Sequence, residues 1–147
     1  MKQENRELLL KDLYARLPYG VKGKCELDAS YDTSFDTVFQ THKFNAEVYG
    51  IKEDLLLVTP LIEDNDEQTY AEEEVADGVS ILDFTPYLFP MSSMTEEQYK
   101  EYWELEHSGN MEHLSIPALD WLNKNHFDYR NLINKNLAID CTNLNIY

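Results

Sequence analysis

Glycine or an apolar residue alternates with a charged residue along the stretch Val21-Lys22-Gly23-Lys24-Cys25-Glu26-Leu27. Successive side chains of a β-strand point to opposite faces, so this alternation predicts a strand with one buried and one solvated face. Residues 28–36 follow with several Asp and Ser residues, which are typical of a turn. The fold is therefore expected to be built around a sheet that begins at Val21.

Three further segments have the character of strands. Residues Val38–Tyr49 contain a second alternating pattern, and Leu55–Val58 form a continuous apolar run that is bounded by Pro60. A run of this kind, too short for a helix, is typical of a central strand buried on both faces. Val79–Phe84 is expected to be the fourth strand.

The first helix is predicted at Glu4–Leu17. Its leucines recur at the three- and four-residue spacing that places side chains on one face of a helix. These leucines are Leu9, Leu10, Leu13 and Leu17. Pro18 and Gly20 are expected to end the helix, because proline cannot continue its hydrogen bonding and glycine accepts the conformation that closes it.

Three more helices are predicted in the C-terminal part of the chain. Thr95 and Gln98 have the spacing of a capping box, which opens a helix that runs to His107. Ser115 is the expected N-cap of the next helix, and Asp128 is that of a short third one. Strands followed by helices favour an α+β fold. We expect one domain over residues 1–147, with an N-terminal helix, a small antiparallel sheet of about four strands and three C-terminal helices.

The net charge of −16 belongs to the middle of the chain. Between Glu47 and Glu112 there are eighteen Asp or Glu residues against two lysines, whereas the acids and bases of the two flanks cancel. Residues 63–77 hold eight acids and no base, which predicts a solvated acidic loop. The candidate partner-binding residues are these eight acids: Glu63, Asp64, Asp66, Glu67, Glu72, Glu73, Glu74 and Asp77.

An acidic field of this strength repels phosphate groups and anionic membranes, so direct binding to nucleic acid or to a membrane is not expected. It attracts basic protein surfaces instead, provided that the carboxylates gather on one outer surface. The N-terminus leads into no apolar signal core, and Cys25 and Cys141 are the only cysteines. These features predict a cytoplasmic protein whose cysteines are thiols rather than a disulfide.

The motifs of common cofactor and metal enzymes are missing, so no cofactor is expected. The sequence has no glycine-rich phosphate loop, no Cys-x-x-Cys pair and no His-Glu-x-x-His motif. Asp64 and Asp66 superficially resemble the start of a calcium loop. However, the glycine of its sharp turn is absent, and Val75 stands at the twelfth position, where such a loop needs Glu. No catalytic residue is assigned, and an enzyme is the less favoured interpretation.

Two small groups of side chains remain as candidates for ligand binding. His107 and His113, each preceded by Glu, are residue types that hold divalent metals, but their spacing matches no helical face. Exposed polar residues are the favoured interpretation of this pair. His126, Tyr129 and Arg130 flank a predicted helix junction. Arg130 could bind a carboxylate or phosphate there, and packed rings beside a helix cap are the alternative.

Two segments of the C-terminal half have a recognisable sequence. They are Pro86-Tyr87-Leu88-Phe89-Pro90-Met91-Ser92-Ser93-Met94-Thr95-Glu96-Glu97 and Asp120-Trp121-Leu122-Asn123-Lys124-Asn125-His126-Phe127-Asp128-Tyr129-Arg130. Both resemble an abundant family of small uncharacterised proteins encoded by gut-bacterial phages, prophages and related mobile elements. The opening Leu8–Val21 is similar to the start of that family's sequences. The resemblance implies a protein of a bacterial host cell, and it implies no activity.

The favoured function is that of a phage-type interaction protein whose acidic middle binds a basic surface of a host or phage protein. One form of this hypothesis is an inhibitor that imitates the charge of nucleic acid. Two alternatives stay open. The first is a small metal- or ligand-binding enzyme that uses His and carboxylate groups. The second is a structural or assembly accessory protein whose charge serves solubility.

Overall fold

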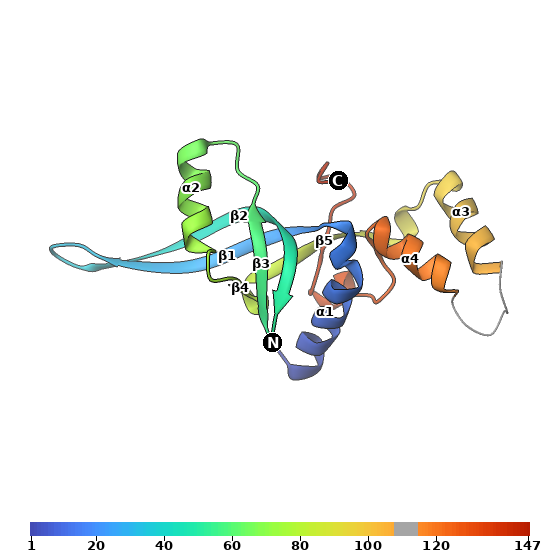
Figure 1. Ribbon diagram of the computed structural model, residues 1–147, viewed down its shortest axis with the longest axis horizontal. Helices are drawn as coiled ribbons and strands as arrows, with labels where there is room; N and C mark the ends of the chain where they lie inside the picture. Colours follow the sequence, from blue (N-terminus) through green and yellow to red (C-terminus); the bar gives the residue numbers. More distant parts are fainter. Residues whose placement is uncertain (108–114) are drawn as a thin grey trace.

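The computed structural model describes residues 1–107 and 115–147 (Figure 1). In this part of the chain a seven-stranded sheet has the order β4-β3-β2-β1-β5-β6, and β7 also pairs with β5. The strands are β1 Val21–Asp32, β2 Thr37–Lys52, β3 Leu55–Pro60, β4 Val79–Ser80, β5 Phe84–Pro90, β6 Phe127–Asp128 and β7 Ile139–Asp140. β6 and β7 run parallel to β5, and the other pairs are antiparallel.

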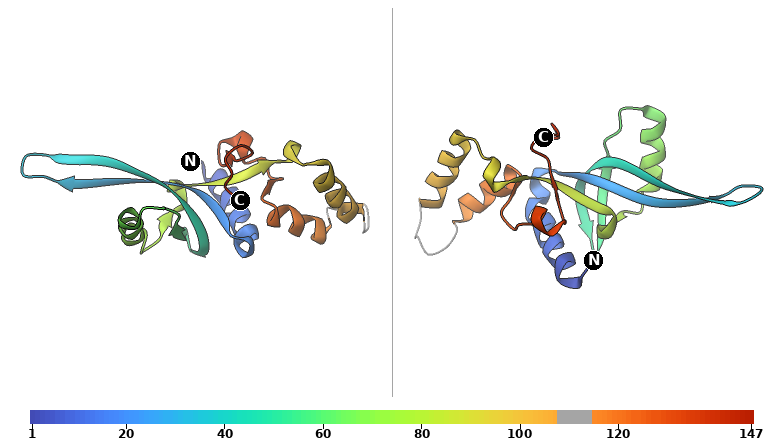
Figure 2. Two further views of the ribbon diagram at one scale, coloured as in Figure 1. Left: turned by 90° about the horizontal axis from the view of Figure 1, so that it is seen from above. Right: turned by 180° about the vertical axis from the view of Figure 1, so that it is seen from behind.

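The described residues also form four α-helices: α1 Gln3–Arg16, α2 Asn65–Glu74, α3 Glu96–His107 and α4 Ile116–Lys124. α1 and α2 lie on the same side of the sheet (Figure 2). α3 and α4 contact each other at one end of the elongated molecule, and the tip of the β1–β2 hairpin forms the opposite end (Figures 1 and 2).

The predicted N-terminal helix is confirmed, but the prediction of a small antiparallel sheet of about four strands with three C-terminal helices is wrong. β6 and β7 are two residues long and therefore show no alternating pattern. They join the sheet because the chain returns beside β5, where Phe89 is in register with Phe127 and Tyr87 with Ile139. The sheet is consequently larger than expected and of mixed direction.

The third C-terminal helix is replaced by a single 3₁₀ turn, Ile133–Lys135. The Asp128 carboxylate accepts hydrogen bonds from the backbone N–H groups of Leu132 and Ile133, both at 2.8 Å. It is not the predicted N-cap, because the N-cap of this turn is Leu132, whose side chain makes no capping bond. Asn136 already adopts a left-handed conformation, with φ at 56°, and this ends the helical path after one turn.

The predicted acidic loop at 63–77 is also wrong, because its central part is helix α2. The Asp64 side chain caps this helix by accepting hydrogen bonds from the N–H groups of Asp66 and Glu67, both at 3.0 Å. Ala71 is completely buried and Val75 is nearly so, and both belong to the core. These two residues are one helical turn apart, so the side of α2 that carries them packs on the sheet.

The core lies between the sheet and the two helices on that side, with contributions from Leu9 and Leu13 of α1. β1 and β5 approach each other closely within it. A Cβ atom on Gly23 would lie 2.2 Å from Cζ of Phe84, so only glycine fits at this position of β1. Cys25 and Cys141 are both buried and free, as predicted.

The β1–β2 hairpin is much longer than the sheet to which it belongs. Its two strands pair from Val21↔Val48 to Asp32↔Thr37, so β1 continues into the segment that was predicted to be a turn. β5 pairs with β1 only at residues 23–25, and β3 pairs with β2 only at residues 46–52. Residues 28–41 therefore project beyond the body as a two-stranded ribbon, which we call the arm (Figures 1 and 2).

Candidate functional site

The candidate partner-binding acids cluster on and around α2. Seven of the eight are exposed: Glu63, Asp64, Asp66, Glu67, Glu72, Glu73 and Asp77. We call these seven residues the α2 acidic surface. Asp66 and Glu73 are two helical turns apart and point away from the buried Ala71. Asp66 and Glu67 also lie in the first turn of α2, where the helix dipole favours negative charge.

α2 is held to the sheet by polar contacts as well as by its buried side. The Gln68 side chain accepts a hydrogen bond from the Ile62 N–H at 3.1 Å and donates one to the Pro60 carbonyl at 2.9 Å. The eighth acid, Glu74, is partly buried, and its Oε2 lies 2.6 Å from Nδ1 of His42 on β2. These contacts fix the position of the acidic surface relative to the sheet.

The α2 acidic surface is not neutralised by neighbouring bases. Within residues 1–107 and 115–147, the ion pairs of lysine and arginine involve Asp12, Glu26 and Asp54. Among the eight candidate acids, only Glu74 has a basic partner in this part of the chain, the imidazole of His42. The full negative charge of the other seven is therefore available to a binding partner.

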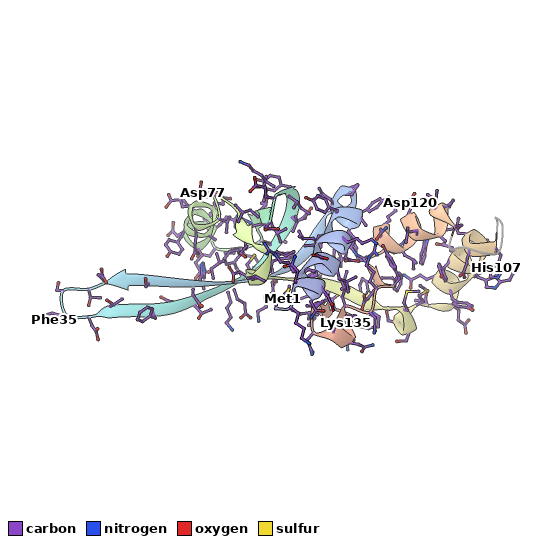
Figure 3. The ribbon with its side chains drawn as sticks, turned by 90° about the horizontal axis from the view of Figure 1, so that it is seen from below. Met1, Phe35, Asp77, His107, Asp120 and Lys135 are labelled. Carbon is purple, nitrogen blue, oxygen red and sulfur yellow. The ribbon has the colours of Figure 1, made fainter. Side chains whose placement is uncertain are left out.

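The binding hypothesis required the acids in the middle of the chain to gather on one surface, but they do not. A second acidic group lies on α3 and comprises Glu96, Glu97, Glu101, Glu104 and Glu106. α3 is at the end of the molecule that is remote from α2, as the positions of His107 and Asp77 show (Figure 3). The acidic region is therefore divided between two surfaces, and the candidate partner-binding residues belong to the one on and around α2.

A cavity of about 220 Å³ lies at the edge of the α2 acidic surface. Its lining includes Tyr49 of β2, Glu72 of α2 and the apolar Val75. Tyr49 is 64% exposed, which is high for an aromatic side chain in a sheet. An aromatic ring, a carboxylate and an apolar floor are the groups that together bind the stem and the charged head of a lysine or arginine side chain.

The second candidate group, His126, Tyr129 and Arg130, is brought together around a buried ion pair. Asp12 and Arg16 of α1 are both completely buried, and Arg130 Nε lies 3.2 Å from Asp12 Oδ1. The guanidinium carbons of Arg16 and Arg130 lie 5.3 Å and 4.8 Å from the centre of the Tyr129 ring. Arg130 thus pairs with a buried carboxylate, and its role in ligand binding stays a prediction.

The prediction of α1 considered only its leucines and therefore missed Asp12 and Arg16. A usable signal was present. At 100° per residue, both positions fall on the same side of α1 as Leu9 and Leu13, the buried leucines. Charged residues within an apolar stripe indicate a buried ion pair, since an unpaired charge is too costly to bury.

His126 is 7% exposed, and its ring stacks on that of Tyr147 at a centroid distance of 3.7 Å. Its Nδ1 atom has no hydrogen-bond partner among the described residues. Burial, and to a smaller extent the nearby charges of Arg16 and Lys22, lower the pKa of His126 to about 4. The imidazole is therefore neutral at physiological pH.

Of the two histidines of the metal hypothesis, His107 is described by the structure, and its contacts do not support metal binding. His107 stacks on the Trp103 ring, and its Nδ1 is 2.8 Å from the Trp103 carbonyl oxygen. His113 lies outside the described residues. In the described segments, no three His, Cys, Asp or Glu side chains are placed so that they could hold a metal ion.

No family model matches the chain, and neither curated proteins nor solved structures give a significant match. The resemblance to phage-encoded proteins therefore stays a prediction. Among the described helices, none combines the length and the apolar character that crossing a bilayer requires.

Proposed function

We propose that the protein is a non-enzymatic interaction protein that docks a basic surface of another protein against the α2 acidic surface. The observation that carries the proposal is the set of seven exposed carboxylates without a basic partner in the described residues, held on a helix that is fastened to the sheet. An ordered surface loses little conformational entropy on binding, which favours affinity. Its electrostatic field accelerates encounter with cations and is weakened by salt.

The partner is proposed to be a basic protein of a bacterial host cell or of a phage. The resemblance to phage-encoded proteins supports this setting, and the charge of α2 supports the chemistry. Nucleic-acid-binding proteins are one class of such partners, because their grooves are built to attract a row of negative charges. For that class, binding to α2 would compete with binding to nucleic acid. The cavity beside Tyr49 and Glu72 offers a place for one lysine or arginine side chain of the partner.

The test compares two variants with the same loss of charge. The first is Asp66→Asn with Glu67→Gln and Glu73→Gln, which neutralises part of α2. The second, Glu96→Gln with Glu97→Gln and Glu104→Gln, removes the same number of charges from α3 at the remote end. Purified wild type and both variants are used to capture proteins from bacterial lysate at low and at high salt.

We expect the wild type and the α3 variant to retain the same basic partner at low salt and to release it at high salt. The α2 variant should fail to capture it. Equal loss of capture by both variants would show that net charge alone is responsible, and full capture by the α2 variant would remove α2 as the binding surface. Capture that is insensitive to salt would remove the electrostatic basis of the proposal.

A further inference from the structure

The arm has an open edge along β2. Between Thr37 and Phe44, β2 pairs with β1 on one side only, because its pairing with β3 begins at Ala46. In the described part of the chain no other strand covers this edge. The edge therefore presents unpaired backbone N–H and C=O groups, which form a template for a further strand.

The composition of the arm favours the addition of a strand. An isolated two-stranded ribbon is marginally stable in water, so an additional strand stabilises it. The segment Thr37–Thr41 carries no charge and is rich in residues that favour strands. Phe39 is 81% exposed, and Phe35 at the tip is fully exposed (Figure 3). Two apolar side chains of this size and exposure on one projecting element would be stabilised by a partner that covers them.

The negative charge of the arm favours an added strand with basic side chains. The arm carries Asp28, Asp32 and Asp36 and has no lysine or arginine. Lys43, beside the base of the arm, is paired with Glu26 at 3.4 Å. A cavity of about 390 Å³ on one face of the arm is lined by residues of both strands, among them Asp28 and Phe39. One oxygen of Asp28 accepts a hydrogen bond from the Thr41 hydroxyl at 2.8 Å. A lysine or arginine side chain in this cavity would lay its stem on Phe39 and its charged head beside Asp28.

We infer that the open edge of β2 at residues 37–44 binds an extended segment of a partner protein that carries lysine or arginine at alternate positions. In this mode, backbone hydrogen bonds provide affinity and the cavity at Asp28 and Phe39 provides specificity. The inference deepens the proposed function and rests on it for the basic character of the partner. α2 lies beside the base of the arm, in the half of the molecule that ends at the tip of the arm, so one partner can contact both (Figures 1 and 3).

A second copy of this chain fits the arm less well. Each copy has a net charge of −16, and each arm adds three aspartates to the contact. Antiparallel pairing of two arms would bring these like charges close together, which disfavours association. Association of two copies through the arm is therefore an outcome that the experiment must be able to detect.

The probe is a synthetic peptide in which lysine and valine alternate over about eight residues, the length of an ordinary strand. A second peptide of the same sequence has methylated backbone nitrogens on one edge, so that it keeps its charge but cannot pair as a strand. NMR spectra of the labelled full chain report which amides shift and which become protected from hydrogen exchange. The expected result is protection of amides within residues 37–44 by the first peptide only.

Two variants that each remove one negative charge test whether the cavity at Asp28 and Phe39 determines the preference for a basic strand. Asp28→Asn should weaken binding of the lysine–valine peptide about tenfold, because one charge-assisted contact is lost. Asp36→Asn, at the tip and outside the cavity, should change it less than about twofold. Equal effects of the two variants would overturn the assignment of the cavity as the specificity site.

The remaining outcomes separate the inference from the proposed function. Equal binding of the methylated peptide, or shifts confined to α2, would overturn strand addition and leave the proposed function standing. Protection of residues 37–44 that rises with protein concentration without peptide would replace the partner strand by a second copy. If a strand adds at the arm but the α2 variant still captures its partner from lysate, the proposed role of α2 is overturned. The inference about the arm then stands.

Discussion

Arg16 Nε donates a hydrogen bond to Asp12 Oδ2 at 2.7 Å, and both side chains are completely buried one turn apart on α1. An Arg16 Nη2 hydrogen bond to the Phe127 carbonyl at 2.7 Å ties α1 to β6, which is distant in sequence. Arg130 Nε lies 3.2 Å from Oδ1 of the same carboxylate. One buried carboxylate thus connects the N-terminal helix with the C-terminal part of the fold.

Replacement of Asp12 by Asn should therefore be strongly destabilising. It leaves the guanidinium of Arg16 buried without a counter-charge, which costs about 3–5 kcal/mol of unfolding free energy. Urea unfolding followed by circular dichroism measures this loss. Lys11→Gln, on the exposed side of the same helix, is the matched control and should change stability by less than about 0.5 kcal/mol. Similar losses for the two variants would contradict a structural role for the buried pair.

Gly23→Ala should destabilise the contact between β1 and β5. The added methyl group would lie 2.2 Å from Cζ of Phe84 and 2.6 Å from the Thr85 backbone oxygen. Overpacking of this kind costs about 1–3 kcal/mol. Gly50→Ala is the control, because its methyl group would meet the flexible end of Leu57 at 3.0 Å. Thermal or urea unfolding should rank Gly50→Ala as the milder change, and the reverse order would refute the assigned close approach.

His126 should make stability depend on pH. Its folded pKa, about 4, lies below the ordinary value, 6.5, so the unfolded chain binds the proton first as pH falls. Its contribution is fully present above the unfolded pKa and is lost as pH falls toward the folded pKa. The loss between about pH 7.5 and about pH 5 should be about 2 kcal/mol.

His126→Asn is the comparison for this pH effect, because His126 has φ at 60° and Asn tolerates that left-handed conformation. Urea unfolding of the variant at the same two pH values should show a smaller decrease in stability than the wild type. An identical decrease in both proteins would mean that other groups cause the pH dependence.

Asp64 is both the N-cap of α2 and a member of the α2 acidic surface, and two substitutions separate these roles. Asp64→Ala should reduce stability by about 1 kcal/mol and raise the hydrogen-exchange rates of the first α2 amides. Asp64→Ser removes the charge but keeps an oxygen that can cap, so it should stay close to wild type in both measurements. Equal destabilisation by Ala and Ser would show that the charge, rather than the cap, stabilises α2.

Helix starts were predictable where the signal is local. Thr95 N–H donates to Gln98 Oε1 at 2.9 Å, and Gln98 N–H donates to Thr95 Oγ1 at 3.1 Å, which confirms the capping box. The Ala118 N–H donates to Ser115 Oγ at 3.1 Å, which confirms the next cap. Such interactions join residues three positions apart, so their spacing is visible in the sequence.

The α2 error has a different origin. The density of acids was treated as a sign of a loop, although Asp64 precedes Glu67 at capping-box spacing and Ala71 precedes Val75 by one helical turn. The sequence therefore located the candidate acids along the chain but did not predict their conformation. A loop would leave its charges mobile, whereas the helix, which packs on the sheet, holds them in place on its exposed side, and this difference supports the proposed binding role.

The sequence by itself determined the N-terminal helix, the start of the first strand, the caps of α3 and α4 and the location of the negative charge along the chain. Each of these depends on neighbouring residues or on composition. Only the tertiary structure decided that Asp12 and Arg16 are buried together, that β6 and β7 join β5, and that the acids divide between α2 and α3. These outcomes depend on contacts between residues far apart in the chain, which form when packing and the pairing of buried charges lower the free energy of the whole molecule.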